Sequence, residues 1–239
     1  MPPRLNCRDL GCELRLSGPY NLFLSPHPDD LVFSCFSALR PGLKNSAIIF
    51  FNSSTFSRWP IHSERLVSSY RTLEDRFVLG ILGIKTKYLF GRDTSISSPA
   101  DATTKIEWNM QLEMPSRIYS PLGVGGNANH IQVREWAVKH WLYWEKKCDL
   151  FFYEDLPYAA KLESSLNETE QSILREVEPS CGKIYPCLEP LSKKMLERKL
   201  LLSRFYFSQT DHSSLLEKFA ELRGKSTKTG FAEAMFNVT

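Results

Sequence analysis

The segment Asn21-Leu22-Phe23-Leu24-Ser25-Pro26-His27-Pro28-Asp29-Asp30 leads into the apolar run Leu31 to Phe36. A short apolar run, a polar turn and a second apolar run predict a strand over 22–25, a turn, and a helix over 31–39. Pro28 fixes its own φ and lacks an N–H, so the turn is stiff. In an open α/β sheet, ligands bind beyond the carboxyl ends of the strands, which is where this turn would lie.

The turn carries three side chains that can bind a metal or a proton. His27 and Asp30 are three residues apart and can reach one cation, which leaves Asp29 free to handle a proton. The competing interpretation is a polar turn in which Asp30 caps the helix, an interaction worth about 1 kcal/mol. For this tetrapeptide alone the cap is the stronger interpretation, and the rest of the chain reverses it.

A second polar loop, Pro121-Leu122-Gly123-Val124-Gly125-Gly126-Asn127-Ala128-Asn129-His130, again joins a predicted strand to a predicted helix. If the two strands are close in the sheet, His130 completes a His/Asp/His set with His27 and Asp30. Three protein ligands plus an open position are the pattern of a catalytic zinc site. Taken alone, His130 would be a helix-start histidine bonded to backbone. The loop is not a Walker-type phosphate cradle, because no Lys-Ser or Lys-Thr follows it.

Together the two motifs resemble the LmbE/PIG-L family of zinc-dependent N-deacetylases, and the resemblance runs from about residue 22 to residue 236. That family has a His-Pro-Asp-Asp turn after a strand and a later Gly-rich His-x-Asp-His loop. The other matching stretches are Arg71-Thr72-Leu73-Glu74-Asp75, Leu82-Gly83, Tyr153 to Ala159, Lys199 to Gln209 and Gly230 to Phe236. The resemblance implies a Rossmann-like fold, a zinc ion or iron(II) ion on His27, Asp30 and His130, and Asp29 as the general base.

The chain departs from the family at one place. The resemblance expects a His that polarises the substrate carbonyl and an Asp that supports it, and the chain has Asn127 and Asn129 there. Some members also have a Tyr two residues before that His, where this chain has Gly125. The metal ligands are therefore kept while the group that polarises the carbonyl is altered. Asn127 still offers an N–H donor for the carbonyl oxygen. Alternatively it only shapes the turn, because Asn tolerates left-handed backbone.

Length and composition limit the classes of protein to consider. The 239 residues, with 42% hydrophobic and 24% charged, suit one globular domain over 1–239. A net charge of +3 gives no case for nucleic acid. No apolar run approaches the roughly 18 residues of a membrane span, and Met1 to Cys12 lacks the core of a signal peptide. We therefore expect a cytoplasmic protein that does not bind membranes.

The six cysteines form no C-x-x-C pair. Cys35 and Cys148 lie in apolar surroundings and are expected to be buried thiols. Cys181 and Cys187 lie in a stretch that contains Pro and Gly, where a disulfide between them is the minority expectation. Cysteines that stay reduced are the default in a cytoplasm.

Predicted strands and helices alternate along the chain, which favours an α/β fold with a mostly parallel sheet and helices on both faces. We expect residues 158–189 to form a loop-rich excursion beside the site and residues 190–239 to form a C-terminal helical segment. The predicted strands are 22–25, 47–51, 87–90, 117–119 and 150–153; the predicted helices are 31–39, 63–82, 130–144, 191–207 and 213–222.

Polar residues after the second and third predicted strands would lie at the same edge of the sheet. Ser54 and Asp93, together with Arg71 from the predicted helix between them, are candidate contacts for the substrate. Polar loop ends are also expected at that edge of any such sheet.

The predicted activity is N-deacetylation of an N-acetylated amino sugar or small metabolite. Zinc lowers the pKa of its water to about 7, Asp29 takes the proton, and Asn127 shares the oxyanion with the metal. Asn127 cannot protonate the leaving amine as an imidazolium would, so Asp29 or water must do so. The alternatives are a hydrolase of another amide or an ester on the same metal site, and a metal-binding homologue with impaired catalysis. A Rossmann nucleotide-binding module ranks last, because G-x-G-x-x-G is missing after the first strand.

Overall fold

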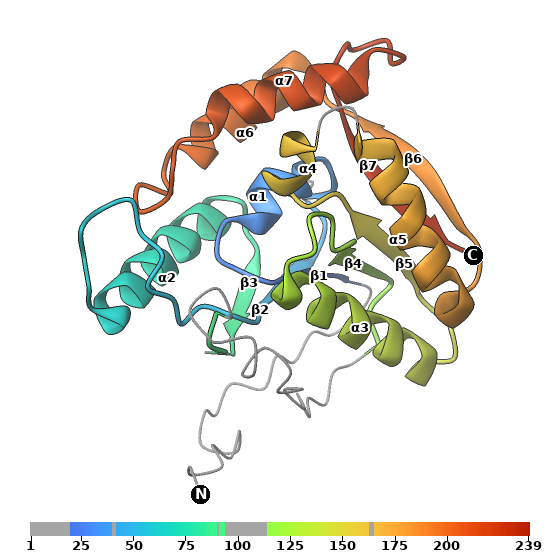
Figure 1. Ribbon diagram of the computed structural model, residues 1–239, viewed down its shortest axis with the longest axis horizontal. Helices are drawn as coiled ribbons and strands as arrows, with labels where there is room; N and C mark the ends of the chain where they lie inside the picture. The colour runs from blue at the N-terminus through green and yellow to red at the C-terminus, as the bar shows by residue number, and fades with distance from the viewer. Residues whose placement is uncertain (1–19, 40–41, 90, 94–113, 163–164) are drawn as a thin grey trace, which may run out of the picture.

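This computed structural model describes residues 20–39, 42–89, 91–93, 114–162 and 165–239, and within them a seven-stranded sheet runs through the molecule (Figure 1). The strand order is β3-β2-β1-β4-β5-β7-β6. The first five of these strands are parallel to one another, whereas β7 is antiparallel to both β5 and β6. The predicted α/β fold with a mostly parallel sheet is confirmed. The strands are β1 (Asn21–Ser25), β2 (Asn45–Ile49), β3 (Lys85–Tyr88), β4 (Arg117–Pro121), β5 (Asp149–Tyr153), β6 (Ile184–Pro190) and β7 (Ala232–Val238).

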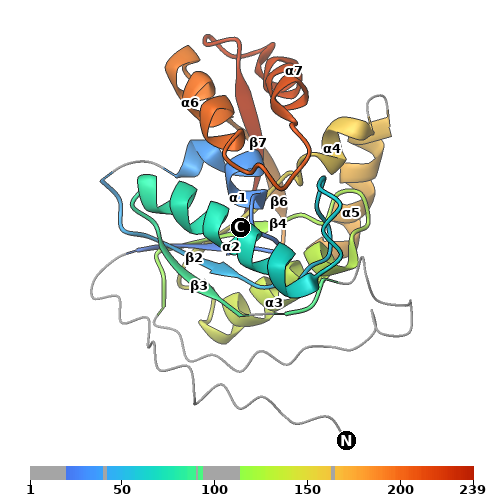
Figure 2. The same ribbon diagram turned by 90° about the vertical axis from the view of Figure 1, so that its left-hand side faces the viewer.

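Helices cover the sheet from two sides. Figure 2 shows α3 beneath the sheet, and α1 with the C-terminal helices α6 and α7 above it. The central strands β1 and β2 are buried at every position, as expected for strands that are covered on both faces. The helices are α1 (Asp30–Ser34), the 3₁₀ turn η2 (Phe36–Ala38), α2 (Glu64–Ile81), α3 (Ala128–Tyr143), α4 (Tyr158–Lys161), α5 (Leu166–Cys181), α6 (Lys193–Ser203) and α7 (Ser213–Gly224).

The helix predicted over 31–39 is shorter than expected. It ends at Ser34 and is followed by the 3₁₀ turn η2. The carboxylate of Glu233 accepts hydrogen bonds from the backbone N–H groups of Phe36 and Ser37, at 3.2 and 2.7 Å. A buried carboxylate that is distant in the sequence therefore satisfies the backbone donors at the start of η2. The sequence pattern around residues 31–39 could not reveal this contact.

The prediction of a loop-rich excursion over 158–189 is wrong. This stretch contains α4, α5 and most of β6. Pro179 lies in the last turn of α5, and Gly182, at φ 104°, follows the helix as its C-cap. Pro186 sits in β6 at the end of the strand order, where a missing backbone donor is tolerated. The Pro and Gly residues that suggested a loop therefore lie at the end of a helix and in an edge strand.

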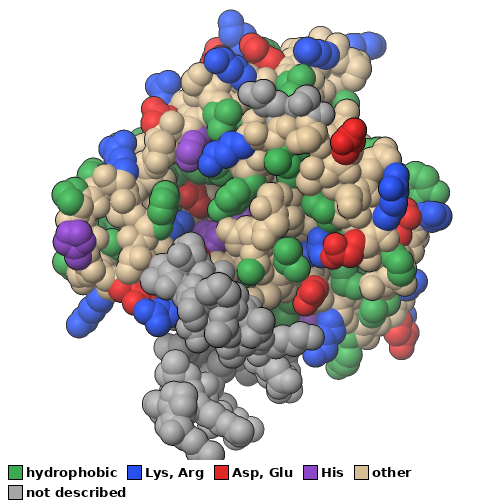
Figure 3. Space-filling view, in the orientation of Figure 1, with side chains coloured by type: hydrophobic (Ala, Val, Ile, Leu, Met, Phe, Trp, Pro, Cys, Tyr) green, Lys and Arg blue, Asp and Glu red, His purple; other side chains and the backbone are tan. Residues whose placement is uncertain are grey.

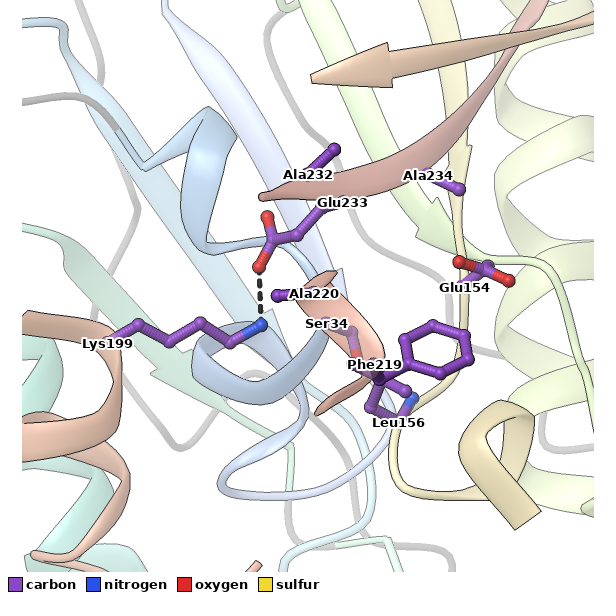
Figure 4. A pocket seen from close by; sticks show the side chains of 9 residues that line it. All are labelled: Ser34, Glu154, Leu156, Lys199, Phe219, Ala220, Ala232, Glu233 and Ala234. Atoms are coloured by element: carbon purple, nitrogen blue, oxygen red, sulfur yellow. Dashed lines mark hydrogen bonds and ion pairs between the residues drawn. The ribbon is translucent and has the colours of Figure 1, made fainter. Parts of the chain in front are cut away.

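The C-terminal segment over 190–239 is helical only in part. It contains α6 and α7, but it ends in β7, which inserts between β5 and β6. A buried ion pair joins α6 to β7, with Lys199 Nζ 2.6 Å from Glu233 Oε1 (Figure 4). The small cavity beside this pair, which Glu154 and Phe219 also line, has room for about one water molecule. Removing one partner of such a pair typically costs about 3–5 kcal/mol.

Four of the cysteines lie within the described residues. Cys35 and Cys148 are buried free thiols, as expected, and Cys181 and Cys187 are also free, so the minority expectation of a disulfide is wrong. Cys7 and Cys12 lie outside the described residues. Within the described ranges, we found no helix with the length and apolar character that crossing a membrane requires.

Candidate active site

The two polar motifs meet at one edge of the sheet because the strands before them are neighbours. β1 pairs with β4 in parallel, with Asn21 opposite Arg117 and Phe23 opposite Tyr119. The strand that follows β1 in the chain, β2, lies on one side of β1, and the strand that follows β4, β5, lies on the opposite side of β4. The strand order therefore reverses between β1 and β4. Ligands of open α/β sheets bind at such a switch point, beyond the carboxyl ends of the strands. Figure 3 shows histidine and acidic side chains on this face of the molecule, between α2 and α4.

The turn after β1 is held by its own polar groups. Ser25 Oγ donates to the carbonyl of His27 at 2.7 Å, and Asp30 Oδ2 accepts from the backbone N–H of His27 at 2.7 Å. Asp29 has a left-handed φ of 100°, which is uncommon for a residue other than Gly. Asp29 occupies the N-cap position of α1 and makes no side-chain capping bond, while Asp30 is already helical. The interpretation of Asp30 as a cap is therefore wrong.

His27, Asp30 and His130 bring their ligand atoms together. One donor atom from each lies within 4.8 Å of the other two, and all three residues are buried. Asp30 Oδ2 is 3.3 Å from His27 Nδ1 and 3.6 Å from His130 Nε2. We call these three residues the metal side of the site. Burial would raise the pKa of Asp30, but the neighbouring rings of His130 and His27 outweigh it and lower that pKa.

The donor set fits a divalent cation. His130 is fully buried, and its Nε2 has no hydrogen-bond partner among the residues that the structure describes. Its other nitrogen, Nδ1, is 2.5 Å from Asp155 Oδ1. Asp155 Oδ2 in turn accepts from the backbone N–H groups of Gly123 and Val124, both at 2.7 Å. A histidine that donates Nδ1–H to a carboxylate presents the lone pair of Nε2, which is how metal-binding histidines are commonly oriented.

His27, unlike His130, contacts an amide group as well as carboxylates on its side chain. Its Nε2 is 2.7 Å from Asn129 Nδ2 and 3.5 Å from Asp93 Oδ1, and Asn129 Nδ2 also donates to Asp93 at 2.9 Å. Although burial opposes it, the carboxylates of Asp30 and Asp93 raise the pKa of His27 to about 9. Asn129, which stands where the resemblance expects a supporting Asp, contacts His27 with its side chain.

Asp29 is not one of the three residues whose ligand atoms come together. Its Oδ1 is 3.7 Å from Arg71 Nη2, and its backbone N–H donates to the carboxylate of Asp75. Burial raises the pKa of Asp29 well above its usual value, although the Arg71 charge opposes this. A carboxyl with a raised pKa is a stronger base than an exposed one, which is the property that a general base needs near neutral pH.

Ser54, Arg71 and Asp93, the candidate substrate contacts, form one chain of interactions. Arg71 Nη1 donates to Ser54 Oγ at 3.0 Å, and Ser54 Oγ donates to Asp93 Oδ2 at 3.1 Å. The loops after β2 and β3 are tied together, because Asp93 N–H donates to the carbonyl of Ser53 at 2.8 Å. All three side chains lie at the predicted edge of the sheet, yet none is more than 4% exposed. Their contact with substrate stays a prediction.

Asn127 begins α3. Its Oδ1 accepts from the backbone N–H of Asn129 at 2.9 Å, and its Nδ2 donates to the hydroxyl of Tyr158 at 3.0 Å. The φ of Asn127 is −66°, so the alternative that it serves as a left-handed turn residue is wrong; Gly125 and Gly126 have the positive φ values instead. We call Asn127 and Tyr158 the carbonyl side of the site, because the resemblance expects the group that polarises the carbonyl at position 127.

Sequence reasoning missed Asp155 and Tyr158 as members of the site. Both belong to the matching stretch Tyr153 to Ala159, which begins at the last residue of β5. β5 is the neighbour of β4, so this stretch lies at the same edge of the sheet as the Gly-rich loop. The sequence signal that could have revealed them is therefore the presence of polar residues directly after a strand that neighbours β4.

Comparison with known proteins identifies the fold. No protein-family model and no curated protein matches the sequence. Among solved structures, the zinc-inhibited form of the teicoplanin deacetylase Orf2 is 17% identical, with a TM-score of 0.64 over 92% of this chain and 98% of that one. The N,N'-diacetylchitobiose deacetylase from Pyrococcus horikoshii is 17% identical, with a TM-score of 0.60 over 93% and 84%. GalB, the 4-carboxy-2-hydroxymuconate hydratase from Pseudomonas putida KT2440, is 13% identical, with a TM-score of 0.63 over 93% and 97%.

At these identities the likeness shows the fold alone. Deacetylases and a hydratase share this fold, so the fold by itself does not select a reaction. The chain therefore has the fold of known deacetylases together with a candidate metal site at the switch point of its sheet.

Proposed function

We propose that this protein is a metal-dependent amide hydrolase of the LmbE/PIG-L type, an N-deacetylase of an N-acetylated amino sugar or another small N-acyl metabolite. The observation that carries the proposal is the buried donor set of His27, Asp30 and His130, which has a further buried carboxylate, Asp29, directly beside it in the sequence. A purely structural metal site has no need of such a carboxylate.

The metal side would hold one divalent ion, zinc or iron(II). Support comes from the buried Nε2 of His130, which has no partner among the described residues, and from Asp155, which orients that ring. Imidazole and carboxylate donors suit both metals. A bound ion of this kind supplies Lewis acidity, which lowers the pKa of water and polarises a carbonyl.

Asp29 is the proposed proton carrier. It accepts the proton of the attacking water as the water oxygen bonds to the amide carbon. It then returns that proton to the departing nitrogen as the C–N bond breaks. Its burial and raised pKa support both roles, because the same group must first take a proton and then release it near neutral pH.

The remaining residues are proposed around this reaction centre. Asn127 lies on the side of the substrate carbonyl, where its amide contacts Tyr158. Arg71, Ser54 and Asp93 are proposed as substrate contacts. Since these three are buried, only a group that reaches the inner end of the site would meet them. We further propose that the enzyme is cytoplasmic and acts as one domain over residues 1–239.

A second candidate is hydrolysis of an ester or of an amide with a better leaving group on the same metal site. The observation that favours it is the neutral pair Asn127 and Asn129, which offers no imidazolium to protonate a departing amine. Such substrates need no dedicated acid.

The experiment that tests the proposal is release of free amine from a panel of N-acetyl amino sugars and small N-acyl compounds, with matched acetyl esters beside them. Each reaction is run metal-free, with one equivalent of zinc or iron(II), and with excess zinc. The excess is included because the structurally similar deacetylase Orf2 is known in a zinc-inhibited form. Metal-dependent amine release supports the proposal, and ester cleavage without amide cleavage selects the second candidate. Metal binding without any turnover would leave a catalytically impaired homologue.

A further inference from the structure

Tyr158 occupies space beside the Gly-rich loop that a side chain of the loop would otherwise fill. A Cβ placed on Gly125 would lie 2.8 Å from the Cβ of Tyr158, closer than real Cβ atoms approach. Gly125 also has a φ of +86°, which disfavours any other residue. Tyr158 comes from α4, after β5, so a different part of the chain brings this aromatic ring to the loop.

The side chain of Tyr158 contacts two residues of the site. It accepts a hydrogen bond from Asn127 Nδ2 at 3.0 Å, and its ring stands edge-on to that of His130, with 5.3 Å between centroids. A phenol that accepts from an amide keeps its own O–H proton available for another acceptor. Burial and the nearby carboxylate of Asp30 raise the pKa of Tyr158, so it stays a neutral donor. The side chain is only partly buried.

The backbone around Tyr158 is anchored to the metal side. Asp155, three residues earlier, holds the ring of His130 and two N–H groups of the Gly-rich loop. The N–H of Leu156 donates to Ser34 Oγ at 2.9 Å, and the N–H of Ala159 donates to the Asp155 carbonyl at 2.8 Å. Tyr158 is therefore positioned relative to His130 by fixed contacts on both sides, as a preorganised donor must be.

We propose that Tyr158 is a catalytic residue whose O–H donates a hydrogen bond to the oxyanion that develops on the substrate carbonyl, while Asn127 holds the phenol in place. This inference rests on the proposed hydrolase function. It assigns to a residue outside the Gly-rich loop the donor role that a histidine at position 127 would otherwise fill. No proton leaves Tyr158 in this role, so Asp29 remains the proton carrier.

The first test is Tyr158→Phe, which deletes the hydroxyl and keeps the ring. We expect kcat to fall by about 10²-fold or more, because deleting one oxyanion donor typically costs 10²–10³-fold. Metal content, KM and Tm should stay close to those of the wild type. The matched control is Tyr119→Phe, which deletes a phenol on β4 that lies beside Arg117. A kcat of Tyr158→Phe within twofold of the control would overturn the inference.

The second test does not need turnover. Methylphosphonate, a tetrahedral anion, is titrated into zinc-loaded wild type, Tyr158→Phe and Tyr119→Phe by calorimetry. We expect Tyr158→Phe alone to bind at least about tenfold more weakly, since the hydrogen bond that it loses is made to a charged group. Equal affinities, or no binding by any of the three proteins, would overturn the inference. If no N-acyl compound is hydrolysed but methylphosphonate binding depends on Tyr158, the assigned reaction fails and the oxyanion site stands.

Discussion

The metal side and the carbonyl side of the site share the Gly-rich loop and α3 but differ in charge. On the metal side, His130 is backed by the carboxylate of Asp155 and His27 lies near that of Asp93. On the carbonyl side, an amide meets a phenol and both are neutral. A set that contains carboxylates can hold a cation without substrate, whereas neutral donors act only on charge that develops during the reaction. Metal binding and turnover should therefore be separable by mutation.

The largest expected effect concerns Asp29, which lies beside the metal side without belonging to it. Asp29→Asn should lower kcat by about 10²–10⁴-fold and leave metal content unchanged, because general acid–base groups contribute about that much. Steady-state kinetics and elemental analysis of the same preparation check both. Loss of the metal would make Asp29 a ligand, and unchanged turnover would remove it from the mechanism.

The next effect concerns Asn127 on the carbonyl side. Asn127→Ala should lower kcat by about 10²–10³-fold and, because the N-cap of α3 is lost, lower the stability by about 1 kcal/mol. Asn127→Gly is the control, since Gly at an N-cap costs only a few tenths of a kcal/mol and also deletes the donor. If Gly restores full activity where Ala does not, Asn127 acts as a cap alone.

A smaller effect, on metal affinity, is expected from Asp155, the carboxylate that contacts Nδ1 of His130. Asp155→Asn should weaken zinc affinity by about 10–100-fold, as changes to such partners typically do. Chelator competition measures this, with Asp149→Asn, an exposed carboxylate at the start of β5, as the matched control. Affinities that agree within twofold would mean that Asp155 supports the loop and not the metal.

The smallest effect is on pH dependence. Because the carboxylates of Asp30 and Asp93 outweigh burial and raise the pKa of His27 to about 9, metal must displace a proton from His27 below that pH. Apparent zinc affinity should therefore fall by up to about tenfold for each pH unit below 9. Competition with a chelator of known pKa values checks this between pH 6.5 and 9. An affinity that is flat, or that rises on acidification, would contradict the assignment of His27 as a ligand.

The same comparison shows what the sequence could and could not predict. His27, Asp30 and His130 were predictable because each lies in the turn, or in the first turn of the helix, that follows β1 or β4, and the strand order only had to place β1 beside β4. Asp155 and Tyr158 were missed because their partners are distant in the sequence, and burial of a carboxylate against an imidazole leaves no local pattern. Similarly, α5 was missed because Pro179 and Gly182 resemble loop signals until the helix end is seen.

The central claim is that the metal side holds one catalytic ion, and the most direct test measures metal occupancy and product release together. Metal-free wild type and His130→Ala are titrated with zinc and with iron(II), and amine release from the best N-acyl substrate is recorded at each step. We predict that wild-type activity rises in proportion to occupancy up to one ion per chain, and that His130→Ala gains neither metal nor activity. Full occupancy in His130→Ala, or amine release that does not depend on bound metal, would contradict the account.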